Sequence, residues 1–208
     1  DFSATSDNYS NIKIVVNKGQ LLIGKATMTV EHNDYSGVYD GSAHSATVTP
    51  SVTDGTTVEY REKKEGATEE DWSTNVPTIQ NVGSATYEVK VTNPNYEEVQ
   101  IFEVNLAVSA ATLTITAKGQ TYEYNGTARG EDRATYTDAE GLEKVIVEGL
   151  KGADALTGIT LNGQETNAGT YTDKIEPSAA AVGEATGNYN IEYVNGNLVI
   201  TKVDTTLT

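Results

Sequence analysis

Two histidines, His32 and His44, are the side chains that could act as a general base near neutral pH. Nucleophilic catalysis would also need an activated nucleophile and an orienting acid. The chain contains no cysteine, so that nucleophile would have to be a serine or a threonine. No Gly-x-Ser-x-Gly, His-Glu-x-x-His or P-loop pattern is present. We therefore predict no catalytic residue, no cofactor and no enzymatic activity.

The acidic side chains could bind calcium. The chain has 30 acidic and 14 basic residues and a net charge of −16, which argues against nucleic acid and anionic membranes as partners. Asp132, Asp138 and Glu140 cluster in one segment, and Asp34 and Asp40 lie close together in another. No EF-hand spacing accompanies either group. We therefore interpret them as solvated loops in preference to calcium sites, and we predict no metal ligand.

Trp72 is the candidate ligand-binding residue. It is the one tryptophan of the chain, and it follows the acidic segment Glu69-Glu70-Asp71. An indole ring can stack on the face of a sugar or anchor a protein interface. The partner would then be a host glycan or an extracellular protein. The alternative is that Trp72 fills the core or the edge of the fold beneath that loop.

Cross-links could also be built from these residues. Disulfides are impossible without cysteine, which suits a reducing compartment or a bacterial surface protein. A Lys–Asn isopeptide bond would be a substitute, and Lys118 with Asn190 or Asn197 are the conceivable partners. The sequence does not decide whether this bond exists.

Short β-strands must position all of these side chains. Residues 27–30 and 112–116 alternate small polar with apolar side chains, as a half-buried strand does. No ten-residue stretch has a helical period, although a β-grasp module would need such a helix. We therefore predict an all-β fold of tandem Ig-like β-sandwich modules, with β-grasp-like modules as the alternative. Asn195-Gly196 is expected to form a two-residue hairpin turn. Further strands are expected at residues 46–52, 57–62, 85–92, 99–108, 144–148, 158–162, 169–175, 190–194 and 197–201.

The sequence repeats itself. Ala26-Thr27-Met28-Thr29-Val30 returns 85 residues later as Ala111-Thr112-Leu113-Thr114-Ile115, and Tyr39-Asp40-Gly41 returns at the same offset as Tyr124-Asn125-Gly126. The glycine of each triplet is expected to occupy a turn of positive φ. The tyrosine beside it is expected to pack its ring on the core while its hydroxyl caps a loop.

These motifs resemble a known family. Tyr-Asp-Gly or Tyr-Asn-Gly, then Asn-Val-Gly (81–83) or Asn-Ala-Gly (167–169), then Asn-Tyr and Gly-x-Leu-x-Ile (196–200) are similar to the YDG and MBG-type repeat modules of large bacterial surface proteins. In the first module, residues 90–96 look more like the bacterial Ig-like repeats of such proteins. The resemblance implies an extracellular adhesin or stalk, and it supplies no ligand residues.

The repeat predicts the organisation of the chain. We expect 1–25 to be the last strands of a preceding repeat, 26–110 the first module, 111–203 the second module, and 204–208 the start of another repeat or a linker. No apolar run reaches the roughly 18 residues of a membrane span. We predict a non-enzymatic stalk or adhesive segment of a bacterial cell-surface or secreted protein, in contact with neighbouring repeats. The alternative is a carbohydrate-binding or accessory module of a secreted polysaccharide-degrading enzyme.

Overall fold

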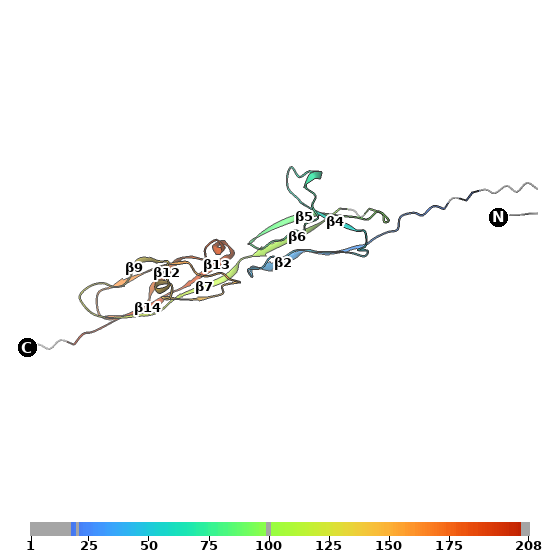
Figure 1. Cartoon of the computed structure of the whole chain (residues 1–208). Coiled ribbons are helices and arrows are strands. Elements are labelled where there is room, and N and C mark those ends of the chain that lie inside the picture. The colour runs from blue at the N-terminus through green and yellow to red at the C-terminus, as the bar shows by residue number, and fades with distance from the viewer. Residues whose placement is uncertain (1–17, 20, 99–100, 205–208) are drawn as a thin grey trace, which may run out of the picture.

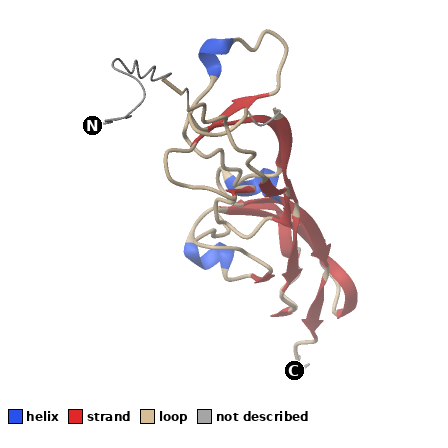
Figure 2. Cartoon of the chain, turned by 90° about the vertical axis from the view of Figure 1, so that its right-hand side faces the viewer, coloured by secondary structure: helices blue, strands red, loops and turns tan. Residues whose placement is uncertain are grey.

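The computed structural model describes residues 18–19, 21–98 and 101–204, and these residues form an elongated all-β chain with its termini at opposite ends (Figure 1). Helices are minor in this part of the chain (Figure 2), where none exceeds four residues. They are η1 (Glu69–Asp71), α1 (Ala139–Leu142) and η2 (Ala185–Asn188). The described residues thus contain no helix that could cover a sheet as in a β-grasp module. The predicted all-β sandwich class is confirmed.

The first β unit contains two sheets. The larger sheet has the order β2 (Tyr35–Val38), β6 (Phe102–Ser109), β5 (Gly83–Thr92), β4 (Thr57–Glu62). Its pairs are antiparallel except for β2 with β6, which is parallel. The smaller sheet pairs β1 (Val30–Asn33) with β3 (Thr47–Pro50). Alternate side chains of β5 and β6 point inward and build most of the core, whose buried members are Met28, Ala46, Tyr60, Val89, Val91, Val104 and Leu106.

The second β unit is larger and also contains two sheets. One has the order β10 (Val145–Glu148), β7 (Ala111–Ala117), β13 (Tyr189–Val194). The other has the order β8 (Gln120–Glu123), β14 (Gly196–Thr201), β12 (Gly169–Ala181), β11 (Gly158–Glu165), β9 (Arg129–Tyr136). The alternation of threonine with apolar residues in β7 buries one side of that strand completely. The largest fully buried side chains of this core are Leu113, Ile115, Ile159, Leu161, Ile175 and Leu198.

The predicted hairpin at Asn195-Gly196 is wrong. Strand β13 pairs with β7, whereas β14 pairs with β12 and β8, so the chain passes from one sheet to the other at this point. A Cβ atom on Gly196 would lie 2.5 Å from the Ala117 carbonyl oxygen. Glycine is therefore required for close approach of two backbones, and not for a tight turn.

The internal repeat is visible in the strand pairing. Ala26 pairs in parallel with Tyr96, and Ala111 pairs in parallel with Tyr189. Strand β8 pairs in parallel with β14 as β2 does with β6. The two units therefore share one arrangement, although the predicted module limits of 26–110 and 111–203 stay a prediction.

The predictions for the two ends are only partly within the described chain. Residues 1–17 and 205–208 lie outside the described residues, and with them most of the preceding repeat and the start of the following one. Residues 18, 19 and 21–25 contain no strand. No helix in the described part of the chain is long and apolar enough to cross a membrane.

Candidate functional site

Tyr39 lies at the centre of the contact between the two units. It follows β2, and its backbone N–H donates to the Ser109 carbonyl oxygen at 2.8 Å. This bond fixes the tyrosine just beyond the last strand of the first unit. The residue is 4% exposed and belongs, with Val108, to the core of the second unit. The interpretation of Tyr39 as a core tyrosine with a bonded hydroxyl is confirmed, but the core is that of the neighbouring unit.

One carboxylate oxygen joins the tyrosines of the two units. The Tyr39 hydroxyl donates to Asp154 Oδ2 at 2.9 Å, and the Tyr189 hydroxyl donates to the same atom at 2.6 Å. The two rings meet edge to face, with centroids 5.5 Å apart and planes at 83°. The Tyr189 oxygen also accepts the backbone N–H of Lys151 at 2.9 Å. This geometry gives both hydroxyls hydrogen-bond partners while the two residues stay buried.

Both hydroxyls stay protonated at neutral pH. Burial and the hydrogen bond to Asp154 raise the pKa of Tyr189 to about 12. The same two causes raise the pKa of Tyr39 above its ordinary value. The tyrosines therefore act as donors to the carboxylate over the physiological range.

A second contact lies beside the tyrosines. The buried Asn188 accepts the backbone N–H of Val82 at its Oδ1 atom, at 2.9 Å, and donates from Nδ2 to Asn81 Oδ1 at 3.0 Å. Gly41 has φ of 84°, and a Cβ atom there would lie 3.1 Å from the Gly152 Cα atom. The contact thus joins the Tyr39-Asp40-Gly41 segment and the Asn81-Val82 loop of the first unit to two loops of the second.

The two cores are continuous across this contact. Tyr35 and Ile79 of the first unit pack against both hydrophobic clusters. Strands β6 and β7 are separated by one residue, Ala110. A one-residue connection together with a buried, hydrogen-bonded interface restricts bending between the units. The described contact is therefore made of buried rings, hydrogen bonds and a shared hydrophobic core.

The sequence does not reveal this site in full. The Tyr-Asp-Gly and Asn-Val-Gly motifs are visible in it because they repeat, but Asp154 lies 115 residues from Tyr39 and belongs to no repeated motif. The exposed Tyr124 also departs from expectation, since 41% of its surface is accessible. No described residue covers Tyr124 as the second unit covers Tyr39.

Trp72 lies in the loop between β4 and β5, directly after η1. Its half-buried ring contacts two cations, with the Arg61 guanidinium carbon 4.5 Å and the Lys90 Nζ atom 4.6 Å from the ring centroid. Both cations are also ion-paired, Arg61 with Glu88 at 2.6 Å and Lys90 with Glu59 at 3.1 Å. The ring therefore covers ion pairs on the β4–β5 sheet surface. Its ligand-binding role stays a prediction.

Three of the five acidic residues considered for calcium, Asp138, Asp34 and Asp40, have protein partners. Asp138 accepts the Gly141 N–H at the start of α1, Asp34 accepts two hydrogen bonds from Asn105, and Asp40 lies 3.0 Å from His44 Nε2. Within residues 18–19, 21–98 and 101–204, no group of three or more His, Cys, Asp or Glu side chains is placed to hold a metal ion.

The side chains considered for an isopeptide bond are all exposed. Lys118 lies just after β7, Asn190 lies in β13 and Asn197 lies in β14. A buried acid assisting such a bond would require a buried pair, so the structure offers no support for this cross-link at these residues.

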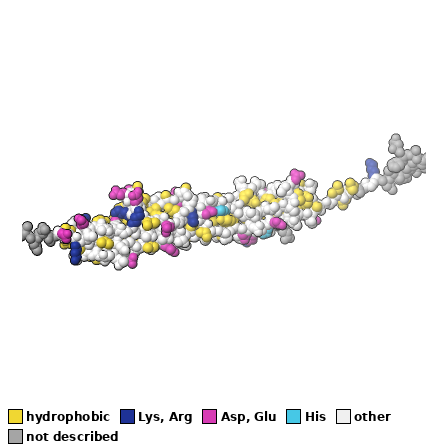
Figure 3. Space-filling view, turned by 90° about the horizontal axis from the view of Figure 1, so that it is seen from below, with side chains coloured by type: hydrophobic (Ala, Val, Ile, Leu, Met, Phe, Trp, Pro, Cys, Tyr) yellow, Lys and Arg dark blue, Asp and Glu magenta, His cyan; other side chains and the backbone are white. Residues whose placement is uncertain are grey.

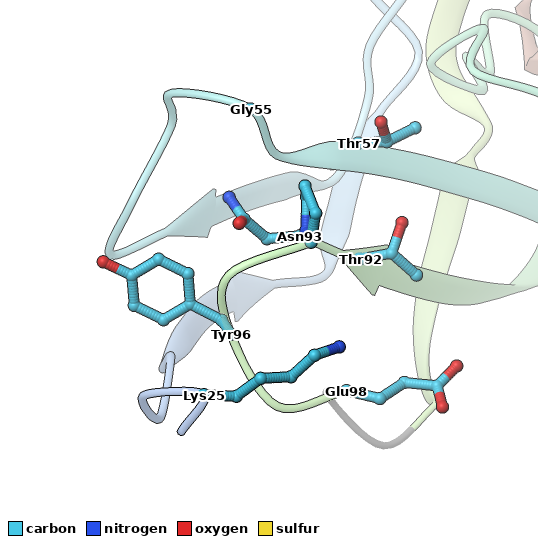
Figure 4. Close-up of a pocket in the computed structure, with 8 residues that line it drawn as sticks. Lys25, Gly55, Thr57, Thr92, Asn93, Tyr96 and Glu98 are labelled. Atoms are coloured by element: carbon cyan, nitrogen blue, oxygen red, sulfur yellow. The ribbon is translucent and has the colours of Figure 1, made fainter. Parts of the chain in front are cut away.

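The N-terminal face of the first unit carries a hollow around Tyr96 (Figure 4). Asn93 is buried there, and its Nδ2 atom donates to the Asp54 carbonyl oxygen at 2.9 Å and to Thr56 Oγ1 at 2.8 Å. The Asn95 N–H donates to Asn93 Oδ1 at 3.0 Å. These bonds tie the loop before Tyr96 to the loop between β3 and β4.

The chain was compared with known protein families, curated sequences and solved structures. No curated protein sequence matches the chain. Among solved structures, it is similar to SGBP-B of the mixed-linkage glucan utilization locus of Bacteroides ovatus, which was solved in complex with a mixed-linkage heptasaccharide. That similarity has 10% sequence identity and a TM-score of 0.26, and covers 85% of this chain and 48% of the other. The chain thus spans about half the length of that protein. The family model of the MBG domain, YGX type, matches residues 113–199 and confirms the MBG-type resemblance for this part of the chain.

Proposed function

We propose that this chain is a non-enzymatic spacer segment of a bacterial cell-surface protein, and that it holds successive β modules in line. The observation that carries the proposal is the shared Asp154 carboxylate, which accepts a hydrogen bond from one tyrosine hydroxyl of each unit. Modules that move independently would not need a buried hydrogen bond between them. It is useful where reach and stiffness are the output.

The surface suits an extended segment. Acidic side chains are distributed along the length of the face seen in Figure 3, and the net charge is −16. Like charge keeps neighbouring chains apart and in solution. The MBG-type match of residues 113–199 supports a location on the bacterial surface, because the resemblance drawn from the sequence is to surface proteins.

Replacement of Asp154 tests the proposal. In Asp154→Ala the two tyrosine hydroxyls lose their acceptor, and we expect the free energy of unfolding to fall by about 2 kcal/mol, since hydrogen bonds to a charged group are worth about 1.5–3 kcal/mol. Small-angle X-ray scattering should show a shorter maximum dimension and a broader range of interunit angles. Asp132→Ala, in an exposed position of the same unit, is the matched control and should change neither quantity. Scattering from Asp154→Ala that matches the parent chain would refute the spacer role of this contact.

Glycan binding at Trp72 is the second candidate function, and it corresponds to the accessory-module alternative. It is favoured by the half-buried ring, which Arg61 and Lys90 hold in one place and which keeps part of its surface accessible. A rigid aromatic surface binds a sugar ring at low entropic cost. A glycan array with the intact chain and with Trp72→Phe tests it, since phenylalanine retains an aromatic ring with less stacking surface. Binding that Trp72→Phe leaves unchanged, or no binding at all, removes Trp72 as a site.

A further inference from the structure

The C-terminal face of the second unit repeats the face of the first unit that carries its neighbour. The Tyr124 N–H donates to the Thr201 carbonyl oxygen at 2.9 Å, as the Tyr39 N–H donates to Ser109 at 2.8 Å. The backbone therefore presents both tyrosines in the same way, just beyond the last strand of each unit.

The turns beside the two tyrosines are also alike. The Thr127 N–H donates to Asn125 Oδ1 at 3.0 Å, as the Ser42 N–H donates to Asp40 Oδ1 at 2.8 Å. The glycines between them have φ of 81° at position 126 and 84° at position 41. The two turns therefore have the same backbone conformation.

The second contact segment is repeated as well. Asn81-Val82-Gly83 precedes and opens β5 in the first unit, and Asn167-Ala168-Gly169 does the same for β12 in the second. Gly83 pairs with Val108 at the end of the neighbouring strand, and Gly169 pairs with Ile200. Ala168 thus occupies the position of Val82, whose N–H donates to Asn188 across the contact.

The two faces differ in what covers them. Tyr39 is 4% exposed beneath the second unit, whereas Tyr124 is 41% exposed. Tyr124, Asn167 and Ala168 line a shallow hollow together with Lys202 and Val203. The second face thus has an exposed tyrosine and a partly buried Ala168 at the positions that Tyr39 and Val82 occupy at the first contact.

We propose that the C-terminal face of the second unit, formed by Tyr124, Asn125, Gly126, Asn167 and Ala168, is a docking surface for the N-terminal face of a further MBG-type module. Its partner is recognised by an Asn-Tyr pair and a loop carboxylate, which Asn188, Tyr189 and Asp154 supply at the observed contact. This inference rests on the proposed spacer function and extends it to a second, successive junction.

The N-terminal face of the first unit contains part of this recognition pattern. Asn95-Tyr96 corresponds to Asn188-Tyr189, because Tyr96 and Tyr189 pair with the equivalent Ala26 and Ala111. Asn95 is exposed where Asn188 is buried, and the neighbouring loop contains Asp54. A face of this kind is thus common to both units, and it becomes buried where another unit covers it.

An extended chain tests the proposal. A second copy of residues 111–202 is joined directly after Lys202, which corresponds to Ala110 at the observed junction. Amide hydrogen exchange is then measured at Val82 and at Ala168 of the original second unit, which the added unit would cover. We expect exchange at Ala168 to slow by at least about tenfold relative to the natural chain, because its N–H gains an acceptor in a buried contact. Val82 should be protected in both chains.

Two variants of the extended chain are the controls. Tyr124→Ala removes the ring that would dock, and Tyr124→Phe removes only its hydroxyl. Both should restore fast exchange at Ala168, with the smaller effect in Tyr124→Phe, while Val82 stays protected.

Unchanged exchange at Ala168 in the extended chain, with Val82 protected, would overturn the docking surface and leave the spacer function intact. Loss of protection at Val82 in the natural chain would count against the spacer function itself. Protection of Ala168 in the natural chain that increases with protein concentration would assign the face to a second chain and would also overturn the proposal.

Discussion

At the scale of single residues, Glu131 is a charged side chain buried in the core region of the second unit. Its side chain is 2% exposed and accepts hydrogen bonds from Gln120 Nε2 at 2.6 Å, from Lys144 Nζ at 2.8 Å and from the Tyr136 hydroxyl. Burial alone would raise its pKa, but the bonds from Lys144, Tyr136 and Gln120 outweigh burial and lower the pKa below its ordinary value of 4.5. The carboxylate is therefore stabilised as an anion inside the second unit.

This lowered pKa makes the free energy of unfolding depend on pH. Because the folded-state pKa lies below that of the unfolded chain, the contribution of Glu131 is fully present above about pH 4.5 and is lost as the pH falls through the folded value. We expect Glu131→Gln to unfold about 1–3 kcal/mol more easily at pH 7, since the Lys144 and Tyr136 donors lose a charged acceptor. Below pH 4 the difference from the parent should shrink. Urea unfolding across pH 3–7 measures both, and Glu165→Gln, at a partly exposed pair with Lys174, serves as the control. A pH-independent difference would contradict the assignment.

At the scale of elements, the passage from β13 to β14 depends on one glycine. Gly196 has no positive φ, so its requirement is spatial: a Cβ atom would lie 2.5 Å from the Ala117 carbonyl oxygen and 2.9 Å from that of Lys118. Gly187, in η2, has no positive φ either and has no atom within 4 Å of a Cβ position. Neither glycine is required by its φ angle, and only Gly196 is required by the space around it. Comparing them therefore isolates the effect of close approach.

Alanine at these two positions should have different effects. We expect Gly196→Ala to reduce the free energy of unfolding by about 2–3 kcal/mol, because β14 must move away from the end of β7. Gly187→Ala should change it by less than about 1 kcal/mol. Thermal unfolding followed by circular dichroism compares them. Equal effects of the two substitutions would mean that the close approach at Gly196 is relieved by a small shift of the chain.

The elements also show how far the sequence predicts this fold. Strands β7 and β4 were predicted correctly because their sequences alternate between polar and apolar or aromatic side chains. Strands β8 and β9 were not predicted, since Gln120–Glu123 and Arg129–Tyr136 are mostly polar and have no clear alternation. The Asn195-Gly196 prediction is wrong because a glycine required for close approach of two backbones looks the same in the sequence as a glycine required for a hairpin turn. Tertiary contact, which the sequence does not display, decides between them.

The candidate site was predictable to a similar degree. The repeat marked Tyr39 and Gly41 as structural, but a repeat shows only what two units share. Asp154 serves one contact between different units, so the pairing of Tyr39 with a carboxylate 115 residues away required the folded chain.

At the scale of the whole molecule, the contact between the units should make them unfold together. Stability of a repeat array is the sum of the unit terms and the interface terms, and a strong interface couples neighbouring units. Tyr39 and Val108 belong to the core of the second unit, so the interface term is part of a hydrophobic core and not only of a polar rim.

Tyr39 and Tyr124 provide a matched pair for this coupling, because they stand at equivalent positions of the two units and differ in what covers them. Tyr39→Ala removes a buried ring, and we expect a loss of about 3–5 kcal/mol, as for other buried aromatic side chains. The single urea transition of the parent chain should separate into two transitions, one for each unit. Tyr124→Ala removes a ring that is 41% exposed, and the natural chain should lose less than about 1 kcal/mol and keep a single transition. Because the two substitutions delete the same atoms, the difference between them measures the contribution of the neighbouring unit. Two transitions already present in the parent chain would mean that the units are stable independently of this contact, and that Tyr39 stabilises only the unit it enters.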